Sequence, residues 1–236
     1  IYTVFEHNIK ILGAAAQRGY THEVRLAALF HDIAKPETKE GEGKDCTFYN
    51  HEVVGKPKTY RILKRLKYPK EYLRIVPHLV RHHMFYYSLD EVTDAAVRRL
   101  ISRVGKENMD QLIQLRMCDR LGMGRPKAKP YKLKKLEERV QIVQLDPISV
   151  KMLAIDGNDL MKELEMKPGP RLKYLLEALM SDILEDPKNN TKKYLLQRVK
   201  ELNEQSDIEL QQLAPDFKAL QKEQESRLIK EHEFVD

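Results

Sequence analysis

The sequence predicts an all-α protein, and three observations support this. Charged residues make up 33% of the chain and hydrophobic residues 42%, many of them Leu, Lys, Glu and Arg, and tryptophan is absent. This composition is typical of soluble helical proteins. Apolar residues recur at spacings of three and four in successive segments, which is the period of an amphipathic helix. Proline, glycine and capping residues separate these segments, so that each helix has predicted ends.

The length and composition limit the class of protein. A chain of 236 residues is long enough for one large or two small domains with buried cores. No apolar run approaches the roughly 20 residues that span a bilayer, and the first residues lack the pattern of a signal peptide. We therefore expect a cytoplasmic protein with no membrane attachment. Cys46 and Cys118 are too few for a disulfide framework, and we expect free thiols.

The net charge of +6 is unevenly distributed along the chain. Residues 200–236 contain ten acidic and five basic side chains, so they carry −5 and the preceding residues carry +11. A basic body favours a polyanionic partner such as nucleic acid. Solvated lysine-rich helix faces give the same balance, so the charge alone leaves both interpretations open.

The first half of the chain divides into helices joined by short connections. Helices are predicted at about 2–17, from 22 through the His31-Asp32 pair to a stop at Pro36, from about 50, at 70–86, at 90–104 and from 107. Thr21 and Asp90 have side chains suited to helix N-caps. Residues 37–50, with two glycines, are predicted to be a loop, and Gly55 permits a close approach to the third helix.

The second half is expected to begin after a basic, proline-flanked connector, residues 124–130. Helices are predicted at 131–145, 157–165, 170–185 and 191–202, and Pro170 suits the first turn of its helix. The expected parts are residues 1–124, residues 125–205 and an acidic, helix-prone tail at 206–236 that is interrupted at Pro215.

Histidine and aspartate residues lie at inward-facing or end positions of five predicted helices: His7, His31, Asp32, His51, His83 and Asp119. His82 is rotated by roughly 100° from the inward stripe and is a weaker candidate. A single histidine on an apolar stripe is more often a hydrogen-bonded core residue than a metal ligand. However, bare carboxylates in a core are prohibitively costly, and no basic partners are evident for the two aspartates. That these six side chains converge on a metal ion is therefore a simpler interpretation than six separate core residues.

The kind of ligand narrows the choice of metal. Imidazole and carboxylate groups without thiolate suit a hydrolytic centre rather than a structural zinc site. We expect one or two divalent ions, with Mg, Mn, Fe, Co and Ni all compatible. Such an ion lowers the pKa of water toward about 7 and neutralises phosphate oxygens.

The order of these residues, with Lys35 in the string His-Asp-Ile-Ala-Lys, resembles the HD-domain superfamily of metal-dependent phosphohydrolases over about the first half of the chain. The resemblance implies a principal metal held by four ligands: His7, His31, Asp32 and Asp119. Asp32 would also bridge to a second ion. His51 and His83 would bind that second ion or the phosphate, and a histidine of this pair would protonate the leaving group. Lys35 would add positive charge at the transferred phosphate, and Ala34 stands where the superfamily commonly has glycine.

Three strings in the second half carry a further resemblance: Gly157–Met161, Lys167–Arg171 and Asn190-Thr191 with Tyr194–Leu196. In order and spacing they resemble the C-terminal region of bacterial tRNA nucleotidyltransferases that carry an HD domain, the family of CCA-adding enzymes and poly(A) polymerases. The resemblance covers about residues 148–202. It implies a helical region that packs beside the HD domain and helps to hold tRNA.

The chain lacks the Gly-Ser and paired Asp-x-Asp pattern that a nucleotidyltransferase head needs for its two metals. We therefore expect that this chain alone does not add nucleotides. It is either the C-terminal part of a longer enzyme with an N-terminal head or a headless relative, and the sequence leaves both open.

Basic side chains form two candidate surfaces for RNA phosphates. We expect RNA phosphate contacts from seven basic residues: Lys58, Arg61, Lys64, Arg65, Arg125, Lys127 and Lys129. Such contacts hold RNA without reading its sequence, although a solvated helix face is an equally good interpretation of each surface.

Three functions remain open from the sequence. The first is a phosphohydrolase of the phosphatase or 2′,3′-cyclic phosphodiesterase type that acts on tRNA or another phosphate ester. The second is the tRNA-binding body of a CCA-adding enzyme whose HD site is idle. The third is a nucleotide or signalling-nucleotide phosphohydrolase, against which only the second half of the chain argues.

Overall fold

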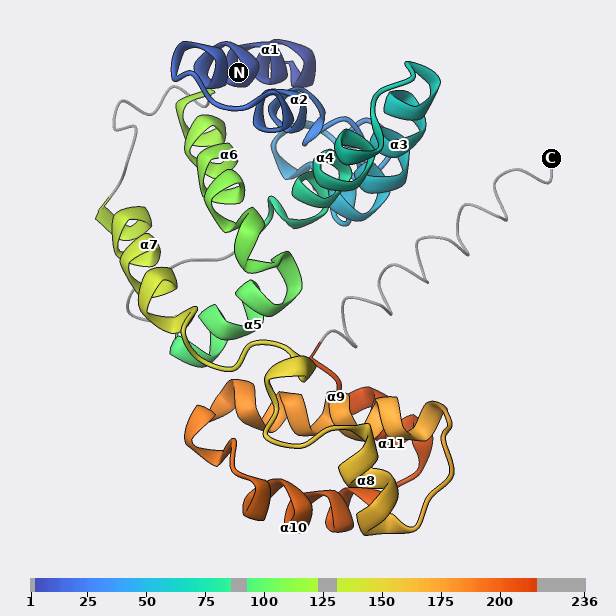
Figure 1. The fold of residues 1–236 in the computed structure, drawn as a ribbon. Coiled ribbons are helices and arrows are strands. Elements are labelled where there is room, and N and C mark those ends of the chain that lie inside the picture. Colours follow the sequence, from blue (N-terminus) through green and yellow to red (C-terminus); the bar gives the residue numbers. More distant parts are fainter. Residues whose placement is uncertain (1–2, 86–92, 123–130, 216–236) are drawn as a thin grey trace, which may run out of the picture. The chain divides into compact units, whose positions relative to one another are not determined.

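The computed structural model describes residues 3–85, 93–122 and 131–215. In these ranges the chain forms α-helices and short 3-10 turns, and the one strand-like pairing is an isolated bridge between Glu40 and Thr47. The predicted all-α class is confirmed (Figure 1). None of the helices in these ranges is both long and apolar enough to cross a bilayer.

The chain divides into two compact units. Of the described residues, 3–85, 104–122 and 131–137 belong to the first unit, and 93–103 and 138–215 belong to the second. The expected boundary at residues 124 and 125 lies outside the described residues and stays a prediction.

The first unit is organised around α2 (His22–Phe30), which packs against α1 (Val4–Gln17), α4 (Lys70–His82) and α6 (Met109–Gly122). α3 (His51–Arg65) packs along α4, and α1 packs along α6. The apolar stripes predicted from the sequence point inward, because Ala28, Leu79 and Leu112 are completely buried. Three helices therefore pack directly against α2, and α3 joins them through α4.

α2 begins after Thr21 as predicted, but it ends at Phe30, before the predicted stop at Pro36. Tight turns replace the helix at this point: Ile33 N donates to Phe30 O (3.1 Å) and Lys35 N donates to Asp32 O (3.0 Å). The His31-Asp32 pair thus lies immediately after the helix rather than within it.

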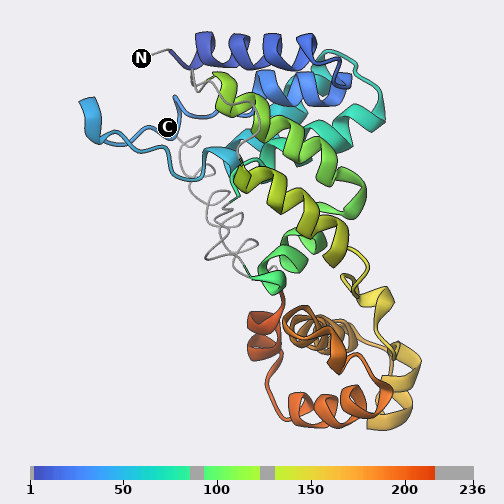
Figure 2. The same cartoon turned by 90° about the vertical axis from the view of Figure 1, so that its left-hand side faces the viewer.

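Residues 31–50 connect α2 to α3. Figure 2 shows the predicted loop, residues 37–50, extending away from the helices of its unit. It contains the 3-10 turn Gly43–Asp45. Asn50 has a left-handed backbone (φ 60°) and leads into α3, so His51 is the first residue of that helix. α4 ends at His82, with His83 as its C-cap. The predicted helix 70–86 is therefore too long at its end, since residues 83–85 are not helical. The predicted cap Asp90 lies outside the described residues.

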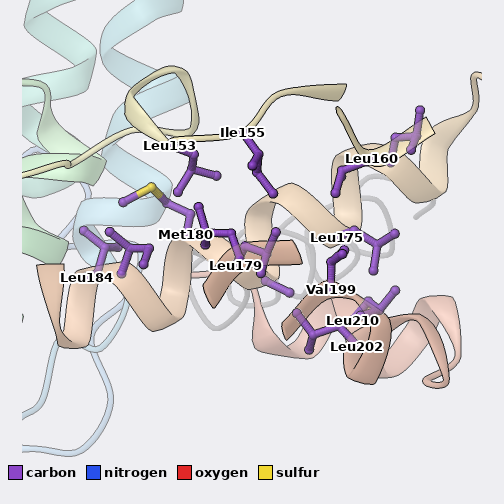
Figure 3. Packing of buried hydrophobic residues seen from close by; sticks show 14 residues of the cluster. Leu153, Ile155, Leu160, Leu175, Leu179, Met180, Leu184, Val199, Leu202 and Leu210 are labelled. Carbon is purple, nitrogen blue, oxygen red and sulfur yellow. The ribbon is translucent and has the colours of Figure 1, made fainter. Parts of the chain in front are cut away.

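The second unit is organised around α9 (Pro170–Glu185), which contacts α8 (Gly157–Leu164), α10 (Lys192–Asn203) and α11 (Asp207–Leu213). Pro170 occupies the first turn of α9, as predicted. Leucine side chains from all four helices meet in one apolar core (Figure 3), among them Leu160, Leu179, Leu202 and Leu210.

Within the second unit, a buried arginine joins α5 (Asp94–Val104) to α9. Arg98 Nε and Nη2 donate to the carbonyls of Leu184 (2.6 Å) and Glu185 (2.7 Å) at the end of α9. Its Nη1 donates to Asp146 (2.9 Å). The last carbonyls of a helix have no partner within the helix, so Arg98 satisfies groups that α9 leaves open. α7 (Tyr131–Val143) is divided between the two units.

Leu179→Ala tests the core of the second unit. Leu179 is completely buried in the middle of α9, and a cavity at such a site costs about 2–5 kcal/mol of the free energy of unfolding. The matched control is Leu145→Ala, because Leu145 is 77% exposed and its replacement should change stability by less than about 0.5 kcal/mol. Urea denaturation followed by circular dichroism measures both, and equal effects would contradict this packing.

Candidate metal centre

Helix pairs bring the six predicted histidine and aspartate residues together in the first unit. α1 supplies His7 and α6 supplies Asp119, while α3 and α4 supply His51 and His83. The turn after α2 places Asp32 between the two pairs, so that its carboxylate oxygens lie 3.2 to 3.8 Å from imidazole nitrogens of all the histidines in the cluster.

Three of the histidine rings are held in the same way. Nδ1 of His31 lies 2.9 Å from Ala28 O, Nδ1 of His51 lies 2.7 Å from Phe48 O, and Nδ1 of His83 lies 2.7 Å from Val80 O. A backbone carbonyl can only accept, so each Nδ1 carries the donated proton. In a neutral ring this leaves a lone pair on Nε2, the arrangement found for histidines that ligate metals.

Asp32 divides these groups into two sets. Its Oδ2 lies 3.2 Å from His31 Nε2 and 3.6 Å from His7 Nε2. Its Oδ1 lies 3.3 Å from His51 Nε2 and 3.8 Å from His83 Nε2. Within each set of three residues the possible ligand atoms lie within 4.8 Å of one another. One carboxylate is therefore placed to serve two neighbouring ion positions.

Asp119 completes the first set. Its Oδ1 lies 3.3 Å from His7 Nε2 and 3.8 Å from His31 Nε2. The first ion position is thus bordered by two imidazoles and two carboxylates. His31 Nε2 is buried there and forms no hydrogen bond, although Asp32 is close. A buried nitrogen without a hydrogen bond fits a metal ligand, because an ion would satisfy its lone pair.

Both carboxylates are ionised despite their burial. Burial alone would raise the pKa of Asp32, but contacts with two neighbouring histidines and the charge of Lys35 hold it far below its usual range. Burial also opposes ionisation of Asp119, yet the contact with His7, the neighbouring ring of His31 and the charge of Arg116 lower its pKa to about 2. The cluster therefore presents two negative charges to a cation.

The close approach of His51 and His83 also requires a cation or a proton. Their Nε2 atoms are 3.2 Å apart, and two neutral rings would direct lone pairs at each other. Burial lowers the pKa of His83 to about 3, so this ring is neutral. Burial also lowers the pKa of His51, but Asp32 and the Phe48 carbonyl outweigh this effect and raise it. A proton on His51 can lie between the rings, and a metal ion can replace it.

The expectation that the aspartates have no basic partners is wrong. Lys35 Nζ lies 2.6 Å from Asp32 Oδ2, and Arg116 Nη1 lies 2.8 Å from Asp119 Oδ2. Each cation is three residues from its carboxylate, a spacing at which side chains of a helix or a helical turn are neighbours. On α6 this spacing is already visible in the sequence, and it predicts the pairing of Arg116 with Asp119.

Two glycines allow the helix pairs to approach. A Cβ on Gly122 of α6 would lie 2.4 Å from Ile11 of α1 and 3.4 Å from the ring of His7. A Cβ on Gly55 of α3 would lie 3.1 Å from Val80 of α4. The expected close approach at Gly55 is therefore confirmed. Gly122 has the same role between α1 and α6, the helices that carry His7 and Asp119.

The other predicted residues are separate from this cluster. The ring of His82 packs edge-to-face against His78, with 4.6 Å between the ring centroids, rather than against the cluster. Arg61, Lys64 and Arg65 are exposed on α3. Lys58 forms an ion pair with Glu37. The basic residues expected at 125, 127 and 129 lie outside the described residues.

The fold and the cluster define a helical protein with a histidine and aspartate centre suited to divalent metal, and comparison with known proteins identifies the family. The family model described as tRNA nucleotidyltransferase domain 2 matches residues 51–199. The chain belongs to the tRNA nucleotidyltransferase family. This match includes the positions of His51, His83 and Asp119, whereas His7, His31 and Asp32 precede it.

Curated relatives agree with this assignment. The A-adding tRNA nucleotidyltransferase of Deinococcus radiodurans is 30% identical over 185 residues, which are 75% of this chain and 41% of the relative. The CC-adding tRNA nucleotidyltransferase of Thermus thermophilus is 33% identical over 160 residues, 67% of this chain and 35% of the relative. A multifunctional CCA protein of Nitrosococcus oceani is 30% identical over 98 residues, 42% of this chain and 24% of the relative. The chain thus spans less than half the length of these relatives.

Gly122→Ala tests the link between helix packing and the cluster. The added methyl group meets Ile11 at a distance that requires α1 and α6 to separate, and overpacking of this kind costs about 1–3 kcal/mol. We expect a lower melting temperature and weaker Mn²⁺ binding by calorimetry, because His7 moves with α1.

Gly13→Ala is the matched control, since Gly13 lies within α1 and a Cβ there has nothing within 4 Å. It should leave metal binding unchanged and stabilise the helix by roughly 0.5–1 kcal/mol. If Gly122→Ala bound Mn²⁺ as tightly as this control, the close approach of α1 and α6 would not position the ligands.

Proposed function

We propose that this chain is a metal-dependent phosphohydrolase of the HD type within the tRNA nucleotidyltransferase family. One observation carries the proposal: Asp32 directs each of its oxygens to a different pair of imidazole nitrogens. Lone pairs on buried nitrogens next to an ionised carboxylate suit a divalent cation. The order of these residues also resembles the HD superfamily.

The ligand sets follow from the distances. A first ion would be held by four residues: His7, His31, Asp32 and Asp119. A second would be held by Asp32 with His51 and His83. Mg, Mn, Fe, Co and Ni are compatible with these nitrogen and oxygen ligands. When bound, the metal supplies a water-derived nucleophile at neutral pH and neutralises phosphate oxygens.

The remaining chemistry belongs to side chains of this protein. Lys35 is 26% exposed, so its ammonium group can bind a phosphate oxygen at the edge of the cluster while its stem stays packed. His51 or His83 is placed to give a proton to the departing alcohol oxygen whenever it does not ligate an ion. A cation for the phosphate oxygens and a histidine proton donor together suit the hydrolysis of phosphate monoesters and 2′,3′-cyclic phosphates.

His31→Ala and Asp32→Ala test this function. Each removes a buried ligand, so we expect the bound metal, measured by mass spectrometry after dialysis, to fall to background and hydrolysis of a 2′,3′-cyclic nucleotide to stop. His22→Ala is the matched control, because His22 is an exposed histidine of the same α2 helix. It should keep both metal and activity.

The same assay separates the alternatives. Full activity in either metal-free variant would exclude a metal-dependent reaction. A wild-type chain that turns over free nucleotides but no cyclic phosphate would favour the nucleotide phosphohydrolase. A wild-type chain that hydrolyses none of these substrates but binds tRNA would favour an RNA-binding body with an idle site.

A second candidate function, holding tRNA, has its own support. The relatives are named for adding nucleotides to tRNA, and Arg61, Lys64 and Arg65 are exposed on one helix. Since the chain spans 41% and 35% of two relatives, we propose that the complete protein also carries an N-terminal nucleotidyltransferase head. The expected contacts at Arg125, Lys127 and Lys129 remain part of this proposal, whereas Lys58 is already engaged by Glu37.

Replacing both Arg61 and Arg65 with Gln tests the surface of α3. If each arginine binds one phosphate, the slope of log affinity for tRNA against log salt concentration should fall by about 2. Binding is measured by fluorescence anisotropy in EDTA, which removes any contribution from the metal centre. Lys173→Gln is the control, an exposed α9 lysine near Glu177. A slope that is the same in all three proteins would contradict the phosphate contacts.

A further inference from the structure

Positive charge is concentrated where α3 ends and α4 begins. Residues 60–74 contain six basic side chains and a single acidic one, Glu71. All six basic side chains are exposed: Arg61, Lys64, Arg65, Lys67, Lys70 and Arg74. Three of them lie on the last turns of α3, and a tyrosine, Tyr60, lies beside them on the same helix.

Tyr60 and the three α3 cations share the face of the helix that points away from the core. Thr59 and Leu63 are completely buried and mark the opposite, inward face. Residues three and four apart are neighbours on a helix, so Tyr60 and Arg61 both border Lys64. The Lys64 ammonium lies 6.0 Å from the centre of the Tyr60 ring. We call this face, formed by Tyr60, Arg61, Lys64 and Arg65, the α3 surface.

The side chains of the α3 surface are available to a ligand. Tyr60 is 41% exposed, and within the described ranges its ring contacts Lys64 but no other ring. By contrast, Tyr68 and Tyr72 are half-buried and pack against each other, with 5.6 Å between the ring centroids. The three cations of the α3 surface form no ion pair with any carboxylate that the structure describes.

The turn after α3 adds a cation at a position where the backbone favours glycine. Lys67 has a left-handed backbone (φ 58°). Its N–H donates to Lys64 O and that of Tyr68 donates to Leu63 O, both at 3.0 Å, a pattern in which helices commonly end with glycine. The exposed lysine therefore extends the positive charge beyond the last turn of α3 despite a less favourable backbone.

We propose that the α3 surface binds a single-stranded stretch of RNA, with an unpaired base stacked on the ring of Tyr60 and phosphates bound by the cations beside it. The proposal rests on the proposed tRNA-holding function and adds which part of the RNA is held. Cations alone bind any nucleic acid backbone. An exposed ring beside them selects unpaired nucleotides, because the bases of a duplex are already stacked on each other and cannot stack on a side chain.

Tyr60→Ala tests the stacking. The probe is a labelled RNA of about 12 nucleotides, used as a single strand and annealed to its complement, and binding is measured by fluorescence anisotropy in EDTA. We expect affinity for the single strand to fall by roughly 5- to 150-fold, the range for loss of one base–aromatic stack. Affinity for the duplex and the salt dependence of binding should stay unchanged, because no cation is removed.

Two variants serve as controls. Tyr60→Phe should bind the single strand like the wild type, because stacking needs the ring and not the hydroxyl group. Phe5→Ala removes another exposed aromatic side chain, 73% exposed on α1, and should also leave binding unchanged. Equal binding by Tyr60→Ala and Phe5→Ala would contradict the stacking.

Two further outcomes would overturn the proposal. An equal loss of affinity for the single strand and the duplex in Tyr60→Ala would indicate a disturbed helix surface instead of a lost stack. A wild-type chain that binds poly-glutamate as tightly as the single strand would show that the α3 surface recognises charge alone.

Binding of intact tRNA, measured alongside, distinguishes this proposal from the one on which it rests. If the wild type binds the single strand through Tyr60 but does not bind tRNA, the tRNA-holding function fails and the single-strand role stands. If the wild type binds tRNA and Tyr60→Ala binds both RNAs as tightly, only the stacking on Tyr60 fails.

Discussion

The arrangement of the first unit depends on the carboxylate of Asp32. An isolated ionised carboxylate away from water is too costly for a protein to retain, and Asp32 is only 2% exposed. Histidines from α1, α3 and α4, together with His31 beside it, surround both of its oxygens. Four segments of the unit therefore have to converge on one side chain, and a change in the packing of any of them alters the environment of this charge.

The ends of the helices set the chemistry of the histidines. His31 follows α2 and His83 follows α4, where the last carbonyls have no helical partner. Their rings donate to Ala28 O and Val80 O, so the same hydrogen bonds satisfy the helix ends and fix Nε2 as the nitrogen with the lone pair. His51 obtains the same result from Phe48, just before α3 begins. The hydrogen bonds at these helix boundaries thus also orient the histidine rings so that Nε2 can bind a metal ion.

Much of this arrangement could be predicted, because apolar periodicity identifies the inward face of each helix. It placed His7, His83 and Asp119 toward the core, and the structure brings them to one point. Periodicity does not predict which side chains form pairs when they come from segments that are distant in the sequence. The ion pair between Lys58 and Glu37 and the approach of Gly122 to Ile11 depend on how segments meet in space. The end of α2 at Phe30 cannot be predicted from the sequence either, because residues up to Pro36 are compatible with a helix and only the turn hydrogen bonds exclude it.

The two units should respond differently to a ligand because their interiors differ. The core of the second unit is apolar. Arginine side chains hydrogen-bond the backbone carbonyls that helix ends leave open. Arg98 binds carbonyls at the end of α9, and Arg171 binds those of Asn203 and Gln205 at the end of α10. The described side chains of that core are hydrophobic, so none of them requires an ion. The first unit instead encloses charged aspartates and imidazole lone pairs, and an ion that binds only the folded state stabilises it in proportion to the logarithm of its concentration. Metal binding is therefore expected to couple to the folding of the first unit, whereas the stability of the second unit depends on its apolar packing.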